Sequence, residues 1–325
     1  MSAGWRPAIV ILLLSLVPSV ALAQQGNGDD QAPAKFKSAV SLVSVNAVVR
    51  DRKGRFVSDL AQKDFTVLEA GLPRRILDFR AESDGPVKLA LLFDISGSMR
   101  IGTKAVDARE AARQLFSTLR KSDEAAVFAF DTKLVRVTDF TSDFAALEKS
   151  LENVEPPYGQ TSLYDAVAQT ARVVADAGRG DGRLPQRSAV VVLTDGIDTK
   201  SRLTPEQVTS IASMIDIPVY VVAVTKTIDD PREADTERVN QISGALQSLS
   251  LWTGGDLFVA SAPAHASIAA RQIVDELRHQ YVLAFEASMG GGWRPLQINA
   301  RNRDLVVRAR AGYNAGGDDI AKFDY

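Results

Sequence analysis

The stretch Val87-Lys88-Leu89-Ala90-Leu91-Leu92-Phe93, followed by Asp94-Ile95-Ser96-Gly97-Ser98, decides how this chain folds. Its first part is almost entirely apolar, which predicts a strand buried on both faces. Its second part places a carboxylate and two hydroxyls, each one residue apart, on the turn that follows the strand. A helical pattern over 104–120 comes next, with apolar residues recurring on one side. Because hard cations such as Mg²⁺ prefer oxygen ligands, the turn is a candidate cation site.

Strands and helices continue to alternate up to residue 280. We expect strands at 125–130, 134–140, 189–193, 219–224 and 257–260, and helices at 143–151, 162–177, 204–215, 237–252 and 267–280. The turn Asp131-Thr132-Lys133 is too short for a crossover, so the two strands that it joins should be antiparallel. The pattern predicts an α/β fold with a doubly wound, mostly parallel sheet and one antiparallel edge, over residues 86–280.

Short β segments flank this region on both sides, at 40–83 and at 281–313. Neither segment is large enough to be stable alone, so we expect the two to pack together as one small β unit. Arg301, Arg303, Arg308 and Arg310 alternate on late strands and are predicted to form a solvated sheet face, with a contact with an acidic partner as the alternative. Trp252, at the end of a helix, is predicted to pack in the core.

The chain begins with a pattern typical of a signal peptide. Arg6 precedes an apolar stretch over 8–17, and Ala21-Leu22-Ala23 is a small-x-small cleavage site, which predicts a signal peptide at 1–23. The alternative is an uncleaved anchor, but the apolar stretch is short for a membrane span and is followed by Pro18. Residues 24–39 are polar and are predicted to form a flexible linker, and 314–325 a loose tail. We therefore expect an exported protein, periplasmic or secreted, with no membrane span after cleavage.

Composition excludes several classes of function. The chain has 325 residues, no Cys and only two His, which rules out disulfides, Cys-based zinc sites, thiol nucleophiles and a His-rich metal site. Its net charge is −2, with 38 basic and 40 acidic side chains, so nothing points to a nucleic-acid partner.

Two further fragments contain side-chain oxygens that would complete a cation site at the Asp94 turn. Gly159-Gln160-Thr161 precedes a predicted helix, and Leu193-Thr194-Asp195-Gly196 ends a predicted strand. Ligands of an open α/β sheet bind outside the carboxyl ends of its strands, where both fragments should lie. The predicted cation site therefore consists of Asp94, Ser96, Ser98, Thr161 and Asp195.

This set resembles the metal-ion-dependent adhesion site of von Willebrand factor type A domains, whose pattern is Asp-x-Ser-x-Ser, then a Thr, then an Asp. The resemblance covers about residues 86–280, and the flanking β segments more loosely resemble a group of exported bacterial proteins. It implies a divalent cation, with Mg²⁺ preferred and Mn²⁺ or Ca²⁺ as alternatives. It also implies a non-enzymatic protein whose protein partner offers an Asp or Glu carboxylate to complete the metal shell.

Other interpretations of the same residues stay open. Asp and Ser after a strand are common helix caps, and Thr161 is expected to be an N-cap. The metal could only stabilise loops in a structural or assembly protein. A strand ending in Asp94, with Thr194 on a later strand, also resembles haloacid dehalogenase-like phosphatases, which use such an Asp as a nucleophile. Those enzymes have a second Asp where this chain has Ser96.

Overall fold

The computed structural model describes residues 42–81, 85–154, 159–178, 187–214, 216–224, 236–260 and 262–315, all within the compact unit Val40–Tyr325. The predicted signal peptide and linker, and the predicted tail from residue 316 on, lie outside the described residues. None of the helices in the described part of the chain is long and apolar enough to cross a membrane.

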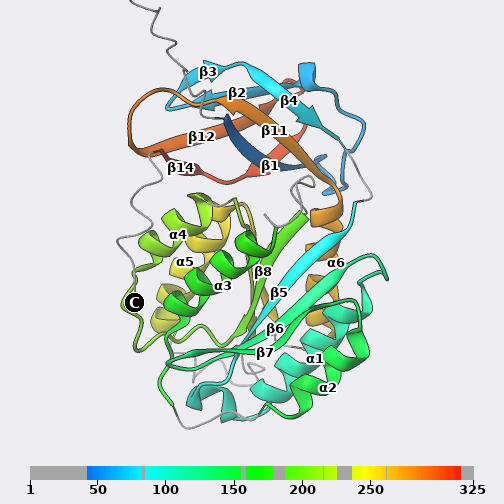
Figure 1. Ribbon diagram of the computed structural model, residues 1–325, viewed down its shortest axis with the longest axis vertical. Coiled ribbons are helices and arrows are strands. Elements are labelled where there is room, and N and C mark those ends of the chain that lie inside the picture. Colours follow the sequence, from blue (N-terminus) through cyan, green and yellow to red (C-terminus); the bar gives the residue numbers. More distant parts are fainter. Residues whose placement is uncertain are drawn as a thin grey trace, which may run out of the picture. The chain divides into compact units, whose positions relative to one another are not determined.

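A six-stranded sheet forms the centre of the α/β part, with the strand order β10-β9-β8-β5-β6-β7 (Figure 1). Its strands are β5 (Val87–Asp94), β6 (Glu124–Phe130), β7 (Leu134–Thr141), β8 (Arg187–Thr194), β9 (Val219–Val224) and β10 (Leu257–Ala260). All neighbouring pairs are parallel except β6 and β7, which are antiparallel. The predicted mostly parallel sheet with one antiparallel edge is therefore confirmed.

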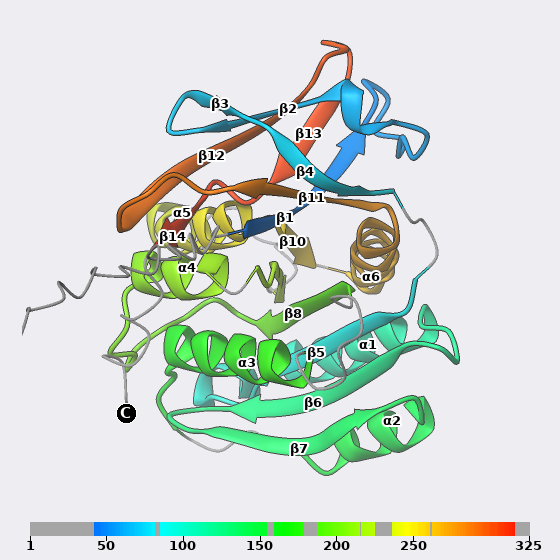
Figure 2. The same ribbon diagram turned by 45° about the horizontal axis from the view of Figure 1, so that its top comes forward.

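Helices cover both faces of this sheet (Figures 1 and 2). They are α1 (Lys104–Ser117), α2 (Phe144–Glu152), α3 (Leu163–Gly178), α4 (Pro205–Met214), α5 (Thr236–Thr253) and α6 (Pro263–Arg278). Alternate residues of β5 divide between two hydrophobic clusters: Leu89 and Leu91 pack with α1, α2 and α6, whereas Ala90 and Leu92 pack with α3, α4 and α5. Burial on both faces explains why β5 is a continuous apolar run rather than an alternating one.

The strand order reverses between β5 and β8, which are neighbours at the centre of the sheet. From β5 the chain passes through α1 to β6 on one side, and it later returns through α3 to β8 on the other side of β5. Such a switch point leaves a crevice at the carboxyl ends of the two central strands, where ligands of doubly wound sheets bind. Asp94 is the last residue of β5, and Asp195 directly follows β8.

The flanking segments form a second β region in which early and late parts of the chain interleave. Early strands are β1 (Leu42–Arg50), β2 (Phe65–Glu69), β3 (Leu72–Arg74) and β4 (Ile76–Arg80), with the short 3-10 helix η1 (Gln62–Asp64) before β2. Late strands are β11 (Gln280–Glu286), β12 (Gly292–Ala300), β13 (Val306–Ala309) and β14 (Gly312–Ala315). Their orders are β13-β1-β11-β4 and β14-β12-β2-β3, so the predicted joint β unit is confirmed.

Two elements of this β unit differ from the prediction. Gly71 to Pro73 predict a turn, but residues 72–74 form β3, an edge strand in which Pro73 is tolerated because an edge strand needs fewer backbone donors. Asn314 and Ala315, expected in the tail, belong to β14, which pairs with the start of β12. The sequence Gly-Tyr-Asn-Ala has little strand signal of its own, and the edge of β12 makes it a strand.

The predictions for Arg308, Arg310 and Trp252 are wrong. Arg308 pairs with Glu276 of α6 and with Asp256, and Arg310 is only 4% exposed. Both side chains lie where the β unit contacts the α/β part, and they bind groups there instead of facing solvent. Trp252 is 41% exposed, and it contributes its carbonyl oxygen, which accepts the backbone N–H of Ala311.

Candidate metal centre

Asp94 lies at the end of β5 and is completely buried. Its Oδ1 accepts the backbone N–H of Ser96 at 2.8 Å, and its Oδ2 accepts the Thr194 hydroxyl of β8 at 2.6 Å. The pKa of Asp94 is raised to about 6, chiefly by burial and to a lesser extent by the charge of Asp195, while the hydrogen bonds from Thr194 and Ser96 act against the rise. Asp94 is thus a mostly ionised carboxylate at neutral pH, held in a fixed orientation inside the protein.

Ser96 and Ser98 bring two hydroxyl oxygens beside this carboxylate. Ser96 begins the short 3-10 helix η2 (Gly97–Arg100), and its Oγ lies 3.1 Å from the Oγ of Ser98. Ser96 is 1% exposed. The N–H of Gly97 donates to the carbonyl of Gly159 at 3.0 Å, which fixes the turn against the loop that contains Thr161.

Thr161 is 2% exposed and is held at this edge through its backbone. Its N–H donates to the Thr199 hydroxyl at 2.9 Å, and its carbonyl accepts the N–H groups of Thr199 and Lys200. The expected N-cap role of Thr161 is wrong. The N–H of Leu163, the first residue of α3, donates instead to Asp198, because the loop after β8 folds over the start of that helix.

Asp195 joins the same edge from the loop after β8. The Nζ of Lys104, the first residue of α1, lies 2.7 Å from Asp195 Oδ2 and 3.5 Å from the carbonyl of Ser98. The side chain of Asp195 is 2% exposed and that of Lys104 is 13% exposed. The structure therefore joins Asp94, Ser96 and Ser98 through direct contacts and Asp195 to Ser98 through Lys104, and it connects Thr161 to the same loops through its backbone.

Sequence reasoning missed two residues of this edge, Lys104 as a whole and the hydrogen-bonding role of Thr194. Lys104 is separated from Asp195 by 91 positions, so no local pattern joins them. One signal was present: a Lys at the first position of a helix opposes the helix dipole, which favours acidic residues there. A cation in that position indicates a specific carboxylate partner.

The donor set fits a hard divalent cation. Two carboxylates supply negative charge and three hydroxyls supply neutral oxygens, a combination that suits Mg²⁺, which binds few protein ligands and keeps several waters. A basic side chain already lies against one of the two carboxylates, so this edge attracts positive charge within the chain itself. In the described ranges no three His, Cys, Asp or Glu side chains group as a metal site, so a cation at this edge would depend on the hydroxyl oxygens as well.

The phosphatase interpretation requires an accessible nucleophilic carboxylate at position 94. Asp94 has no exposed surface, and each of its oxygens accepts a hydrogen bond within the protein. A carboxylate placed in this way can bind an ion that enters from the side of the loops, but it is badly placed to attack a phosphoester in line.

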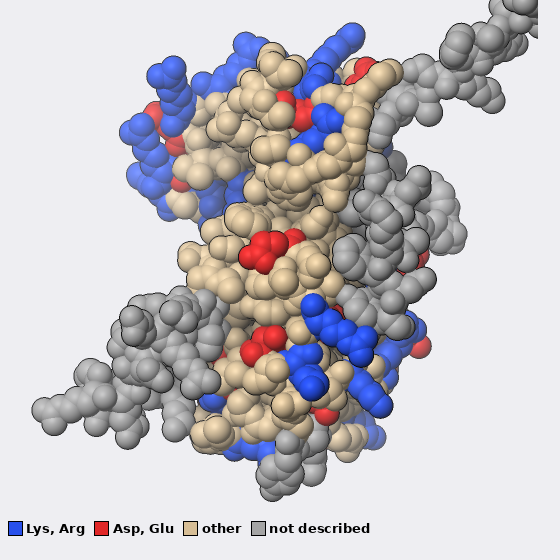
Figure 3. All heavy atoms as spheres, turned by 90° about the vertical axis from the view of Figure 1, so that its left-hand side faces the viewer, with Lys and Arg blue, Asp and Glu red and all other residues tan. Residues whose placement is uncertain are grey.

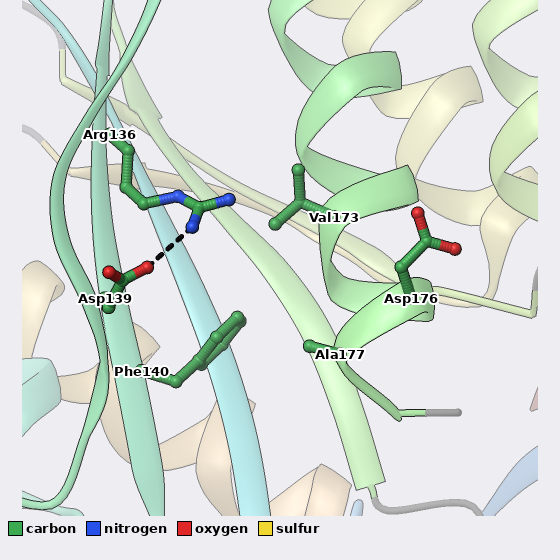
Figure 4. A pocket seen from close by; sticks show the side chains of 6 residues that line it. All are labelled: Arg136, Asp139, Phe140, Val173, Asp176 and Ala177. Carbon is green, nitrogen blue, oxygen red and sulfur yellow. Dashed lines mark hydrogen bonds and ion pairs between the residues drawn. The ribbon is translucent and has the colours of Figure 1, made fainter. Parts of the chain in front are cut away.

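A cavity of about 410 Å³ lies elsewhere, between β7 and the last turns of α3 (Figure 4). It is lined by Arg136, Asp139, Phe140, Val173, Asp176 and Ala177. Leu134 of β7 pairs with Phe130 at the carboxyl end of β6, whereas Thr141 pairs with Ala125 near its start. The Phe140 end of the cavity is therefore remote from Asp94, and its ion pair, Arg136 with Asp139 at 2.7 Å, is largely exposed.

Comparison with known proteins identifies the α/β part. Residues 89–197 match the family model of the von Willebrand factor type A domain, a range that begins in β5 and ends just after Asp195. The search of curated proteins finds no match to the chain.

Solved structures give weaker similarities. An aerotolerance-related membrane protein from Bacteroides fragilis is 19% identical, with a TM-score of 0.46, over 59% of this chain and 98% of that one. A von Willebrand factor type A protein from Catenulispora acidiphila is 15% identical, with a TM-score of 0.46, over 88% and 76% of the two chains. Mussel byssus proximal thread matrix protein 1, in a structure with a zinc-occupied adhesion motif, is 17% identical, with a TM-score of 0.45, over 64% and 49%.

The matched residues include four strands of the central sheet, β5, β6, β7 and β8. Residues 89–197 of this chain therefore match the von Willebrand factor type A domain.

Proposed function

We propose that this protein is an exported, non-enzymatic protein that binds a protein partner through a divalent cation. Asp94, Ser96, Ser98, Thr161 and Asp195 would hold the cation, with Mg²⁺ preferred. An Asp or Glu carboxylate of the partner would take a remaining coordination position. Domains of this family mediate protein interactions and are generally non-enzymatic, which supports the proposal. When bound, the cation supplies an electrophilic centre to which an external carboxylate can bind.

The observation that carries the proposal is the environment of Asp94. Burying an ionised carboxylate is costly unless a positive charge compensates it. Across the described part of the chain, no Lys or Arg forms an ion pair with Asp94, although it is completely buried. Its neighbours are hydroxyl and amide groups, which orient the carboxylate without neutralising it. A bound cation is the compensating charge that this arrangement lacks.

The described residues around the site include side chains of both charges. Lys133, Lys200 and Arg202 are exposed on loops that contact the Thr161 segment. Asp131 accepts the N–H of Lys133 at 2.9 Å, and Asp165 of α3 accepts that of Arg202 at 3.1 Å, so both carboxylates hold the loop backbone in place.

Charges of both signs are also mixed on the wider surface. The face drawn in Figure 3 shows Lys and Arg together with Asp and Glu in both its upper and its lower parts, with much uncharged surface between them. With a net charge of −2, the chain has no broad basic field of the kind that binds nucleic acid. We therefore propose a protein partner and no nucleic-acid partner.

The direct test uses Mn²⁺ as a paramagnetic substitute for Mg²⁺. Water-proton relaxation by Mn²⁺ bound to the protein should fall when a short Asp- or Glu-containing peptide replaces one of the bound waters. The same peptide with Asn or Gln should leave the relaxation unchanged. An acidic peptide that never changes the relaxation of bound Mn²⁺ would contradict a role for the partner carboxylate.

Capture from the native cell envelope then tests the binding function. The wild-type protein should retain a partner in Mg²⁺ and release it in chelator, and Asp94→Ala should retain none under either condition. If chelator instead lowers the melting temperature while partner capture stays unchanged, the cation only stabilises the loops and the proposed function is wrong.

A further inference from the structure

Lys104 is the one basic side chain that the described structure places against the candidate ligands. Its Nζ lies 2.7 Å from Asp195 Oδ2, and it also approaches the carbonyl of Ser98 at 3.5 Å. Both partners belong to the loops that would hold the cation. With 13% exposure the Lys104 side chain is largely withdrawn from water, so this is not an ordinary surface ion pair.

From this geometry we infer that Lys104 is a built-in competitor of the divalent cation: its ammonium neutralises Asp195 in the metal-free protein and must give way when a metal binds. The inference rests on the proposed function, since it assigns Lys104 a role at the same site. An ammonium and a divalent cation that share one carboxylate compete for it, because each loses part of its attraction when the other is present. Lys104 therefore lowers the affinity for the cation and stabilises the metal-free edge.

The position of Lys104 on its element makes this exchange feasible. It is the first residue of α1, and its flexible side chain carries the ammonium on four methylene groups, so the head can leave Asp195 without moving the helix. Just before it, Gly102 adopts a φ of 66°, and Thr103 donates its hydroxyl to Asp107 at 2.6 Å. These contacts hold the start of α1 independently of the Lys104–Asp195 pair.

The arrangement makes the two carboxylates different. Asp195 is paired with the Lys104 ammonium, whereas no basic side chain in the described ranges is paired with Asp94. In the metal-free state this edge thus contains two buried carboxylates, Asp195 with a positive partner and Asp94 without one. The unpaired carboxylate makes the metal-free edge less stable. Half-occupancy of the site should then require a higher cation concentration than the same ligands would require without Lys104.

Replacing Lys104 by Met tests the inference, because Met keeps the length and the apolar stem and removes the charge. Isothermal titration with Mg²⁺ should give a dissociation constant at least tenfold lower for Lys104→Met than for wild type. Thermal unfolding in chelator should show a lower melting temperature for the variant, because Asp195 then loses its partner. Lys104→Arg should keep the weaker affinity of the wild type.

Lys121→Met is the matched control, since it removes one exposed positive charge before β6, at the opposite end of the strands, and should change neither quantity. If Lys104→Met fails to fold, Lys104→Gln replaces it in both measurements. An equal or weaker Mg²⁺ affinity in the variant would overturn the inference and leave the proposed function standing. Absence of binding in both proteins would overturn the proposed function, and the inference with it.

Discussion

At the scale of single residues, Asp94 is the most constrained group of the candidate site. It is completely buried, both of its oxygens accept hydrogen bonds, and burial raises its pKa to about 6. A carboxyl whose pKa in the folded protein lies above its ordinary value of 3.8 favours the protonated, neutral form. Folding therefore opposes the charge that a cation would need, which creates a measurable dependence of stability on pH.

The sign of this dependence follows from linkage. Because the folded pKa is raised, the stabilising contribution of Asp94 is complete below pH 3.8 and is lost as the pH rises through about 6. The full loss corresponds to about 3 kcal/mol for a shift of this size. Asp94→Asn does not titrate, so in chelator the free energy of unfolding of wild type should fall relative to the variant between pH 4 and pH 7.

Urea unfolding of both proteins at a series of pH values measures this difference, and all other titrating groups cancel in the comparison. Added Mg²⁺ at pH 7 should restore the stability of wild type and leave Asp94→Asn unchanged. A difference between the two proteins that stays constant from pH 4 to pH 7 would show that Asp94 titrates normally.

At the scale of elements, the site depends on how closely the strands and their loops approach one another. Gly255, between α5 and β10, shows the tightest approach among the glycines in the described part of the chain: a Cβ atom at this position would lie 2.0 Å from the carbonyl oxygen of Val219 in β9. Only a residue without a side chain allows β10 to enter the sheet beside β9 at this point. The backbone itself supplies the contact, so no rotamer change can relieve it.

Gly255→Ala should therefore destabilise the protein by about 2 to 3 kcal/mol, the usual cost of forcing extra atoms into a packed interior. Gly244→Ala is the matched control within α5, because Gly244 is exposed and a Cβ atom added there would meet no atom within 4 Å. That change should stabilise the helix by about 0.5 to 1 kcal/mol. Chemical unfolding of both variants measures the two effects, and equal stabilities would contradict the close contact with Val219.

Much of the element pattern was predictable because it depends on local periodicity. The apolar run of β5, the short turn at residues 131–133 and the helical repeat of α1 each carry their own signal, and the mostly parallel sheet that they predict is confirmed. The switch point follows from strand order and places Asp94 and Asp195 at one edge. The roles of the five candidate ligands stay predictions.

The features that the sequence did not reveal depend on partners that are far away in the chain. Lys104 meets Asp195, Arg308 meets Glu276 of α6, and β14 exists because β12 offers it an edge. In each case the residue type alone predicts exposure or irregular structure. Tertiary contacts supply the counter-charge or the hydrogen-bond partner that reverses that expectation.

At the scale of the whole molecule, buried basic side chains join the β unit to the α/β part. Arg310 donates to the backbone carbonyls of Ser44 in β1 and Ser213 in α4, and it lies 3.6 Å from Asp216. Asn46 of β1 donates to the same Asp216 carboxylate at 3.0 Å. Ser213 lies near the end of α4, whereas that helix starts beside the candidate site, so this junction is at the opposite edge of the sheet.

Arg310→Met should lower the free energy of unfolding by about 3 kcal/mol, because it leaves two backbone carbonyls without their donor and removes the positive charge beside Asp216. The affinity for Mg²⁺ should stay unchanged, since no ligand of the candidate site contacts the junction. Calorimetric unfolding and Mg²⁺ titration of the variant measure the two quantities. Arg303→Met, which removes an exposed Arg from a surface turn, is the control and should change neither. A loss of Mg²⁺ affinity in Arg310→Met would mean that the two edges are coupled.

The claim that the loops at the carboxyl edge hold one divalent cation has a direct measurement. Equilibrium dialysis of the protein against Mg²⁺ should show one bound ion per chain in wild type and none in Asp94→Ala. Asp139→Ala removes a carboxylate that is 76% exposed on β7 and should bind one ion like wild type. Equal binding by wild type and Asp94→Ala, or no binding by wild type, would contradict the proposed metal centre.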